Sequence, residues 1–395
     1  MKKLSVVLLS SSIACLVLLF ASSCSGSGSG GGSTPNTIGV ASGAAVDSSG
    51  SVYFAGYTGT SSGQLPCYWK NGALISTLDI SGYTYFGTAQ MFADSSGDLY
   101  VMGYVGTSSS TFTPCYWKNG VLNLLSLGTG NTYGAASGAA VDGSGNLYIT
   151  GYTGTSSSSY LPCYWGIGGA LNLLPIGSNS YGWANGIALA SGVLYIAGSQ
   201  GSSSTAETPC YWTVGGTSAN PLGTSGFGVA RGVTVLSGTA YISGAQGPTE
   251  SQAKPCYWNV SGSTTLSTTA LSIGSNPYGR VWGIAPISSA IYVAGYQGTY
   301  NSTVSPGYWI NSTFTSYFPF GSGNTYFSLG WSATDSTYFY TAGGVGTASS
   351  TTVPCYWVNG SLNMLPLGSQ TSKEVKSLAL AAVHPMVTPN DRGGE

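Results

Sequence analysis

The tetrapeptide Pro-Cys-Tyr-Trp recurs along this chain at a nearly constant interval, and that interval limits the possible folds more than any other feature. It occurs six times, and a seventh copy carries glycine in place of cysteine. Successive prolines are 48, 48, 47, 46, 51 and 48 residues apart. A period of this length indicates one supersecondary unit copied along the chain. The seven copies lie at residues 66–69, 114–117, 162–165, 209–212, 255–258, 306–309 and 354–357.

One unit, residues 133–180, shows the pattern of four short strands. Residues 136–141 are small and apolar, and residues 142–145 form an Asp/Gly/Ser turn of the kind that reverses a chain. Residues 146–152 then alternate as a second strand. After a Ser-rich loop, residues 161–165 and 170–174 form a third and a fourth strand. Four such strands in about 48 residues are typical of one blade of a β-propeller.

Seven copies of this unit predict an all-β fold, a single seven-bladed β-propeller of four-stranded antiparallel blades. A helical solenoid is excluded because no segment has an apolar period of 3.6 residues over a useful length. A β-helix would need shorter coils. Residues 375–383 resemble another first strand, so they would either close the ring or begin an unfinished eighth blade. We therefore expect the propeller to span residues 38–383, with a frayed tail at 384–395.

The N-terminal residues form a separate export signal. Lys2 and Lys3 precede an apolar run over residues 6–20, which ends in Ala21-Ser22-Ser23-Cys24. Ala21-x-Ser23 fits ordinary signal peptidase cleavage, whereas Ser22-Ser23-Cys24 resembles a bacterial lipobox with Ala21 in place of the usual Leu. Gly and Ser then dominate residues 25–37, as in a flexible tether. We expect residues 1–24 to be a signal peptide of lipoprotein type, with cleavage before Cys24 so that Cys24 becomes the lipidated first residue. The protein would then be held at the bacterial cell envelope; secretion is the alternative.

One family resemblance is carried by the second strand and its turn. The segment Gly138-Ala-Ala-Val-Asp-Gly-Ser-Gly-Asn-Leu-Tyr-Ile-Thr-Gly-Tyr152 resembles the bacterial β-propeller repeat called SBBP, and residues 43–57 match nearly as well. The Tyr-Trp-Lys-Asn-Gly sequences at residues 68–72 and 116–120 resemble exported repeat lipoproteins. The match covers roughly residues 38–367 and is strongest in the first three units. It implies a propeller on an exported protein and implies no reaction.

Composition excludes several classes of partner. Only 5% of the residues are charged, against about 25% in a typical protein, and the formal net charge is −1. Nucleic acid is therefore not an expected partner, because its binders carry basic patches. No apolar run after residue 20 is long enough to span a membrane, so we expect membrane attachment through the lipid alone. A neutral surface rich in hydroxyl groups suits a glycan or a protein partner, and we expect a monomer.

The repeated cysteines and aromatic residues are expected to be core. Equivalent cysteines on third strands of neighbouring blades would lie about 13 Å apart, given strand spacings of ~4.8 Å. A disulfide needs Cα atoms within about 7 Å, so free, buried thiols are predicted. Alternation places Cys and Trp on one face of the strand and Tyr on the other, and stacked blades bury both faces.

Three residues that interrupt the repeat are the predicted ligand-binding set. Asn185 and Arg231 stand on first strands where Ser42 and Ser137 stand in other units, and Trp282 lies on another first strand. Trp183 and Trp331 also depart from the repeat there. First strands line the axis of a propeller, where ligands often bind. The alternative is that these side chains only fill the centre of the ring.

Catalytic and metal-binding residues are not predicted. The single histidine, His384, lies in the tail, so no Ser-His-Asp triad or histidine metal site can form in the repeats. Asp47, Asp94 and Asp142 occupy turns that offer too few carboxylates for calcium. Glu207 and Glu250 lie in Ser-rich loops of different units, and no paired carboxylates are evident for glycoside hydrolysis. The sequence predicts a non-catalytic binding scaffold without metal or cofactor; a glycosidase or lyase is the alternative.

Overall fold

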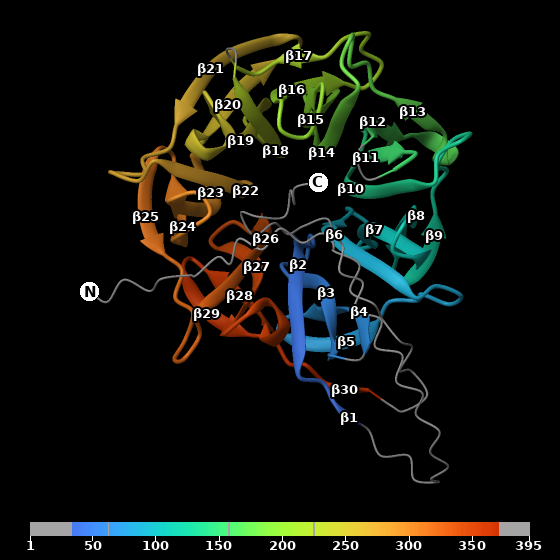
Figure 1. Cartoon of the computed structure of the whole chain (residues 1–395), viewed down its shortest axis with the longest axis vertical. Helices are drawn as coiled ribbons and strands as arrows, with labels where there is room; N and C mark the ends of the chain where they lie inside the picture. Colours follow the sequence, from blue (N-terminus) through green and yellow to red (C-terminus); the bar gives the residue numbers. More distant parts are fainter. Residues whose placement is uncertain (1–33, 62, 157–158, 224–225, 371–395) are drawn as a thin grey trace.

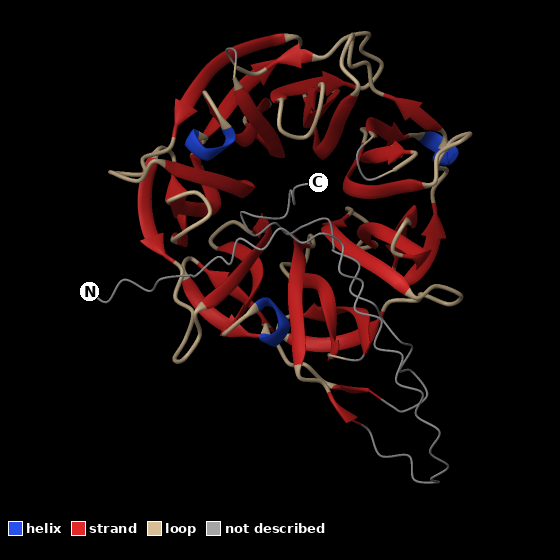
Figure 2. Cartoon of the chain, in the orientation of Figure 1, coloured by secondary structure: helices blue, strands red, loops and turns tan. Residues whose placement is uncertain are grey.

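Seven four-stranded units surround a common axis (Figure 1). The computed structural model describes residues 34–61, 63–156, 159–223 and 226–370. Regular structure there is β, apart from three single-turn 3-10 helices (Figure 2): η1 (Ile167–Gly169), η2 (Glu250–Gln252) and η3 (Ser349–Thr351). Within these described ranges, no helix is long and apolar enough to cross a membrane. The predicted all-β propeller is confirmed.

Each blade is one continuous stretch of chain whose first strand is innermost and whose fourth is outermost (Figure 1). The first three blades comprise β2 (Ile38–Val46), β3 (Val52–Thr60), β4 (Gly63–Lys70), β5 (Ala73–Thr77); β6 (Tyr85–Ala93), β7 (Leu99–Ser108), β8 (Thr111–Lys118), β9 (Val121–Leu124); and β10 (Tyr133–Val141), β11 (Leu147–Gly154), β12 (Tyr160–Trp165), β13 (Leu171–Leu173). The other four comprise β14 (Tyr181–Ala190), β15 (Val193–Gly201), β16 (Glu207–Thr213), β17 (Asn220–Pro221); β18 (Phe227–Leu236), β19 (Thr239–Gly247), β20 (Lys254–Ser261), β21 (Thr264–Ala270); β22 (Tyr278–Ile287), β23 (Ala290–Gly298), β24 (Val304–Ile310), β25 (Thr313–Tyr317); and β26 (Tyr326–Thr334), β27 (Phe339–Gly346), β28 (Val353–Val358), β29 (Ser361–Met364).

Neighbouring strands within a blade are antiparallel and follow chain order, as tight turns require. The second and third blades are also joined by a single parallel bridge between Tyr133 and Phe112. These two blades therefore count as one eight-stranded sheet, and the remaining five blades are separate four-stranded sheets.

The tryptophan of the repeated motif packs between blades. All seven motif tryptophans are at most 1% exposed. Six of them donate an indole Nε1–H bond of 2.6–2.9 Å to a backbone carbonyl that follows the fourth strand of the preceding blade. This bond satisfies the polar atom of an otherwise apolar side chain and joins six of the seven blades to the blade before it. The donors are Trp69, Trp117, Trp165, Trp212, Trp309 and Trp357.

The ring closes where the two ends of the described chain meet. Trp69 of the first blade donates to the carbonyl of Pro366, after the seventh blade. Asn36 Nδ2 donates to the carbonyl of Leu367 at 2.8 Å. Beyond these contacts, β1 (Thr34–Pro35) pairs with β30 (Ser369–Gln370). All seven blades are complete without residues 375–383, which lie outside the described residues, as do the predicted signal and the tail.

Candidate functional site

Every innermost strand carries an irregularity at the same place. In each, the register with the second strand shifts at the middle of the strand, so that the inner strand holds one extra residue. Such a β-bulge redirects the side chain at that point. The residues at this shared position are Ser42, Ala89, Ser137, Asn185, Arg231, Trp282 and Gly330.

The three predicted site residues occupy this bulge position in three consecutive blades, on β14, β18 and β22. The guanidinium of Arg231 lies over the ring of Trp282, 4.6 Å from the centroid. Asn185 Nδ2 donates to the backbone carbonyl of Ala230 at 2.8 Å. Trp282 is buried, whereas Asn185 and Arg231 are half-buried. The structure therefore joins Arg231 to Trp282 directly and places Asn185 beside the strand that carries Arg231.

A second arginine, which the sequence analysis did not single out, lies on the same strand as Trp282. Tyr278, Arg280 and Trp282 alternate along β22, so their side chains share one face of the strand. Arg280 is 2% exposed and forms an ion pair with Glu250 of η2 through its Nη2. Its Nε and Nη1 have no hydrogen-bond partner within the described ranges of the chain. The guanidinium also lies 5.5 Å from the ring centroid of Phe227 and 5.9 Å from that of Tyr278.

Buried tyrosines complete the surroundings of Arg280. The hydroxyl groups of Tyr278 and Tyr296 are 3.3 Å apart, and the Tyr296 ring lies 5.3 Å from that of Trp282. Burial raises the pKa of both hydroxyls, so they stay protonated at neutral pH. We call Arg231, Glu250, Tyr278, Arg280, Trp282 and Tyr296 the Arg–aromatic cluster. It combines two permanent positive charges, one carboxylate and three aromatic rings at the junction of the fifth and sixth blades.

A signal for Arg280 was present in the sequence. At its position the other inner strands carry Val40, Gly87, Ala135, Trp183, Val229 and Ser328, and none of these is charged. Burying a charge costs free energy, and the equivalent positions of the other blades hold uncharged side chains. A charged side chain at this position therefore indicates a candidate functional residue.

Trp183 belongs to a different group. Its indole Nε1 donates to the hydroxyl of Tyr181 at 2.7 Å, and its ring packs against Tyr152 and Tyr160. These residues belong to a buried aromatic cluster to which the second, third and fourth blades contribute. Trp331 is half-buried, one residue beyond Gly330 at the seventh bulge.

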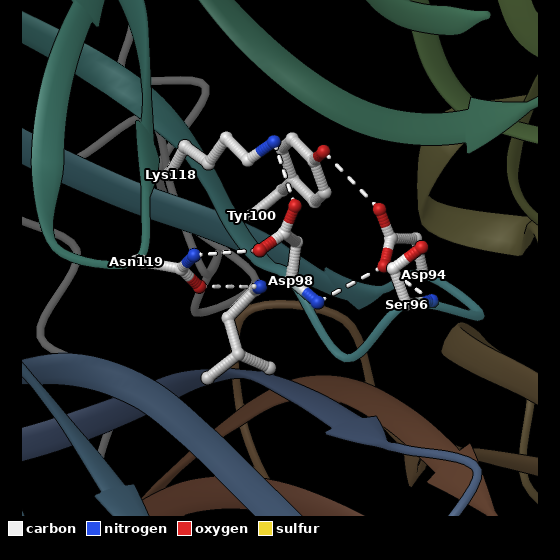
Figure 3. A network of polar contacts seen from close by, with 7 residues as sticks. Asp94, Ser96, Asp98, Tyr100, Lys118 and Asn119 are labelled. Carbon is white, nitrogen blue, oxygen red and sulfur yellow. Dashed lines mark hydrogen bonds and ion pairs between the residues drawn. The ribbon is translucent and has the colours of Figure 1, made fainter. Parts of the chain in front are cut away.

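The aspartate turns are hairpin turns in the structure. Figure 3 shows the turn of the second blade, where Asp94 accepts backbone bonds from Ser96 and Asp98 and a bond from the Tyr100 hydroxyl. The other carboxylate, Asp98, pairs with Lys118 at 2.7 Å. Across the part of the chain that the structure describes, no three His, Cys, Asp or Glu side chains form a metal-holding group.

The other candidate residues fall in the core or outside the described chain. All six motif cysteines are free and buried, as the ring geometry predicts. Glu207 was expected in a loop, but it is the first residue of β16 and fully buried, because β16 starts earlier than the Ser-rich stretch suggests. Glu250 does lie between strands, in η2. Cys24 and His384 lie outside the described residues.

Comparison with known proteins supports the fold and gives no family. No family model matches the sequence, and no curated protein matches it. Among solved structures, a polysaccharide lyase, the PL25 ulvan lyase, matches with a TM-score of 0.52 at 8% identity, covering 88% of this chain and 98% of the lyase. Two weaker matches, which add nothing to the assignment, are a Hadza microbial sialidase (TM-score 0.43, 10% identity, 69% and 66% covered) and the Aleuria aurantia lectin (0.41, 12%, 73% and 100%).

The prediction that the protein is not an enzyme is corrected by the lyase match. A chain of almost the same extent and the same fold is an enzyme. The absence of histidine from the repeats rules out a histidine triad, but acid–base chemistry also uses Tyr, Glu and Lys. This fold gives no ground for excluding catalysis.

Proposed function

We propose that the protein is an exported β-propeller that binds a glycan at the Arg–aromatic cluster, together with Asn185. The observation that carries this proposal is the convergence of Arg231 and Arg280 on one set of aromatic side chains. The chain contains three arginines in all, and two of them meet there. The SBBP-like repeats and a lipid anchor on Cys24 belong to the same proposal, which places the ring at the surface of a bacterial envelope.

The chemistry of the site suits sugar hydroxyl groups. Guanidinium and amide N–H groups donate hydrogen bonds to hydroxyl oxygens, and both are present at neighbouring bulges as Arg231 and Asn185. Trp282 holds the Arg231 guanidinium over its ring, which lowers the entropy that Arg231 would lose on binding. The matched ulvan lyase has been solved bound to -[GlcA(1-4)Rha3S]-, an oligosaccharide. That ligand supports a glycan as the class to test first.

A glycan array probed with the purified protein tests the proposal. Replacing the half-buried Arg231 (Arg231→Gln) should weaken binding of the retained glycan about tenfold, the worth of one charge-assisted hydrogen bond. Lys118→Gln, which removes one positive charge from the end of β8 in the second blade, is the matched control and should leave binding unchanged. Equal affinity in wild type and Arg231→Gln would remove the cluster from the binding site.

Cleavage is assayed on the same glycans. New reducing ends in a bound polysaccharide would make the protein a glycosidase or a lyase, and Glu250→Gln and Tyr278→Phe then identify which group in the cluster transfers the proton. Retention of a protein and of no glycan would replace this proposal with a protein partner.

A further inference from the structure

We propose that Arg280 and Arg231 form an anion site for the carboxylate or sulfate group of an acidic glycan, and that Glu250 is its displaceable internal counter-ion. That the anionic group belongs to a glycan rests on the proposed function above. The anion site itself rests on the side chains of the cluster and can be tested separately.

Arg280 has unused donors in a place where donors are normally satisfied. Among the residues that the structure describes, Glu250 accepts from Nη2 of Arg280 and no group accepts from Nε or Nη1 of Arg280, although the arginine side chain is 2% exposed. A buried N–H group without an acceptor destabilises a fold. Planar carboxylate and sulfate groups match the fork of a guanidinium, so an anion reaching Arg280 would satisfy what Glu250 leaves.

The charge balance of the site also favours an anion. Both arginines are close enough for their charges to act on the hydroxyls of Tyr278 and Tyr296. Glu250 is the carboxylate that acts on the same surroundings, because burial and then the charge of Glu250 raise the pKa of Tyr300. Within the Arg–aromatic cluster the guanidiniums outnumber the carboxylates by two to one. Burial among aromatic rings strengthens the attraction of a guanidinium for an anion.

Glu250 is placed so that it can leave. It is the first residue of η2, a single turn with no buried residues, and its side chain is 17% exposed. The flanking residues Pro248, Thr249 and Ser251 are exposed. Rotation of Glu250 into solvent would open the Nη2 side of Arg280 without moving β22.

Thermal unfolding of the full chain with sodium glucuronate, against glucose at matched ionic strength, tests the site. We expect glucuronate and not glucose to raise the unfolding temperature. Arg231→Gln should weaken the glucuronate response about tenfold, and Glu250→Gln should strengthen it about tenfold, because the competing carboxylate is gone. Lys118→Gln is the charge control. Glucose 6-sulfate in a parallel titration separates sulfate from carboxylate recognition.

Arg280 is not substituted in this test, because its loss from the core would also perturb folding. Equal responses to glucuronate and glucose overturn the anion site, and so does a Glu250→Gln response no stronger than wild type. Binding of neutral glycans alone on the array overturns the anion site and leaves the proposed function standing. A glucuronate response without retention of any polysaccharide on the array supports the anion site and overturns the proposed glycan-binding function.

Discussion

Individual side chains in this protein are defined by an environment with almost no charge. The motif cysteines show this most directly. Each lies on a third strand against the core, and burial raises the thiol pKa of all six, so the thiolate needed for reaction does not form near neutral pH. They behave as small apolar residues.

Native protein should therefore resist thiol alkylation. We expect no labelling of Cys67, Cys115, Cys163, Cys210, Cys256 or Cys355 by iodoacetamide at pH 7 or at pH 9, and labelling of all six in denaturant without reductant. Intact mass measures both. Peptide mapping assigns the labels, and a disulfide between any two of these cysteines would contradict the inter-blade spacing.

The charged carboxylates of the turn aspartates stabilise their own hairpin turns by accepting hydrogen bonds. The Ser49 hydroxyl, the backbone N–H groups of Ser51 and Ser49 and the Tyr53 hydroxyl all donate to Asp47. The Ser49 hydroxyl bond contributes most, and together these bonds lower the pKa of Asp47 from 3.8 to about 2.

A lowered carboxyl pKa stabilises the fold above the unfolded-state pKa, and this contribution disappears as the pH falls towards the folded-state value. Asp47→Asn should reduce the free energy of unfolding at pH 7, and the difference from wild type should shrink as the pH falls from about 4 to about 2. Urea unfolding at several pH values measures it. Ser49→Ala should show part of the same effect, and a difference that does not change with pH would exclude the charge as its cause.

At the scale of single elements, the second strand of every blade depends on one glycine. A Cβ at Gly151 would press against the carbonyl oxygen of Ala135 on the inner strand and the ring of Trp165 on the third strand. The equivalent glycines Gly103, Gly198, Gly244 and Gly343 meet the same two kinds of neighbour, and at Gly56 and Gly295 the three nearest atoms all belong to the inner strand. The inner bulge, the glycine and the motif tryptophan therefore form one packing unit.

Gly151→Ala should reduce the free energy of unfolding by about 1–3 kcal/mol, the usual effect of overpacking a core. Gly143→Ala in the same blade is the matched control, because nothing lies within 4 Å of a Cβ there. Urea denaturation compares the two. Equal losses would show that the close approach at Gly151 is relieved by a small movement of the strand.

The strands themselves could be predicted closely from the sequence, whereas the site could be predicted only in part. Residues 161–165 were expected as a third strand, and β12 runs from Tyr160 to Trp165. The bulges were not foreseen, because Gly, Ala and Ser along an inner strand carry no signal of which face is buried. Arg280 and its contact with Glu250 were missed for another reason. Which side chain of one blade meets which side chain of the next depends here on the local path of η2 and β22, and the repeat pattern does not encode that path.

At the scale of the whole molecule, contacts between neighbouring blades hold the ring together. Between the first and the seventh blades, these contacts join residues that are far apart in the sequence. Asn36 Nδ2 bonds to Leu367 O, whereas Asn324 Nδ2 makes the same kind of bond to Phe320 O, four residues away. Both side chains donate to a backbone carbonyl, but the two bonded residues are 331 positions apart in one case and four in the other.

Asn36→Ala should lower stability by about 1 kcal/mol and increase amide hydrogen exchange in both the first and the seventh blades. Asn324→Ala should increase exchange only around residues 320–325. Exchange measured by mass spectrometry separates the two outcomes. If Asn36→Ala affects the first blade alone, the contact with Leu367 does not hold the ring shut.

The meeting of β1 with β30 means that this ring has no structurally privileged starting point. Each blade is built from one uninterrupted stretch, and residues 34 and 370 lie side by side. A circular permutant, with those two positions linked and new termini opened at any connection between blades, would contain every contact of the original ring. The order of the repeats in the gene is then one of seven equivalent orders.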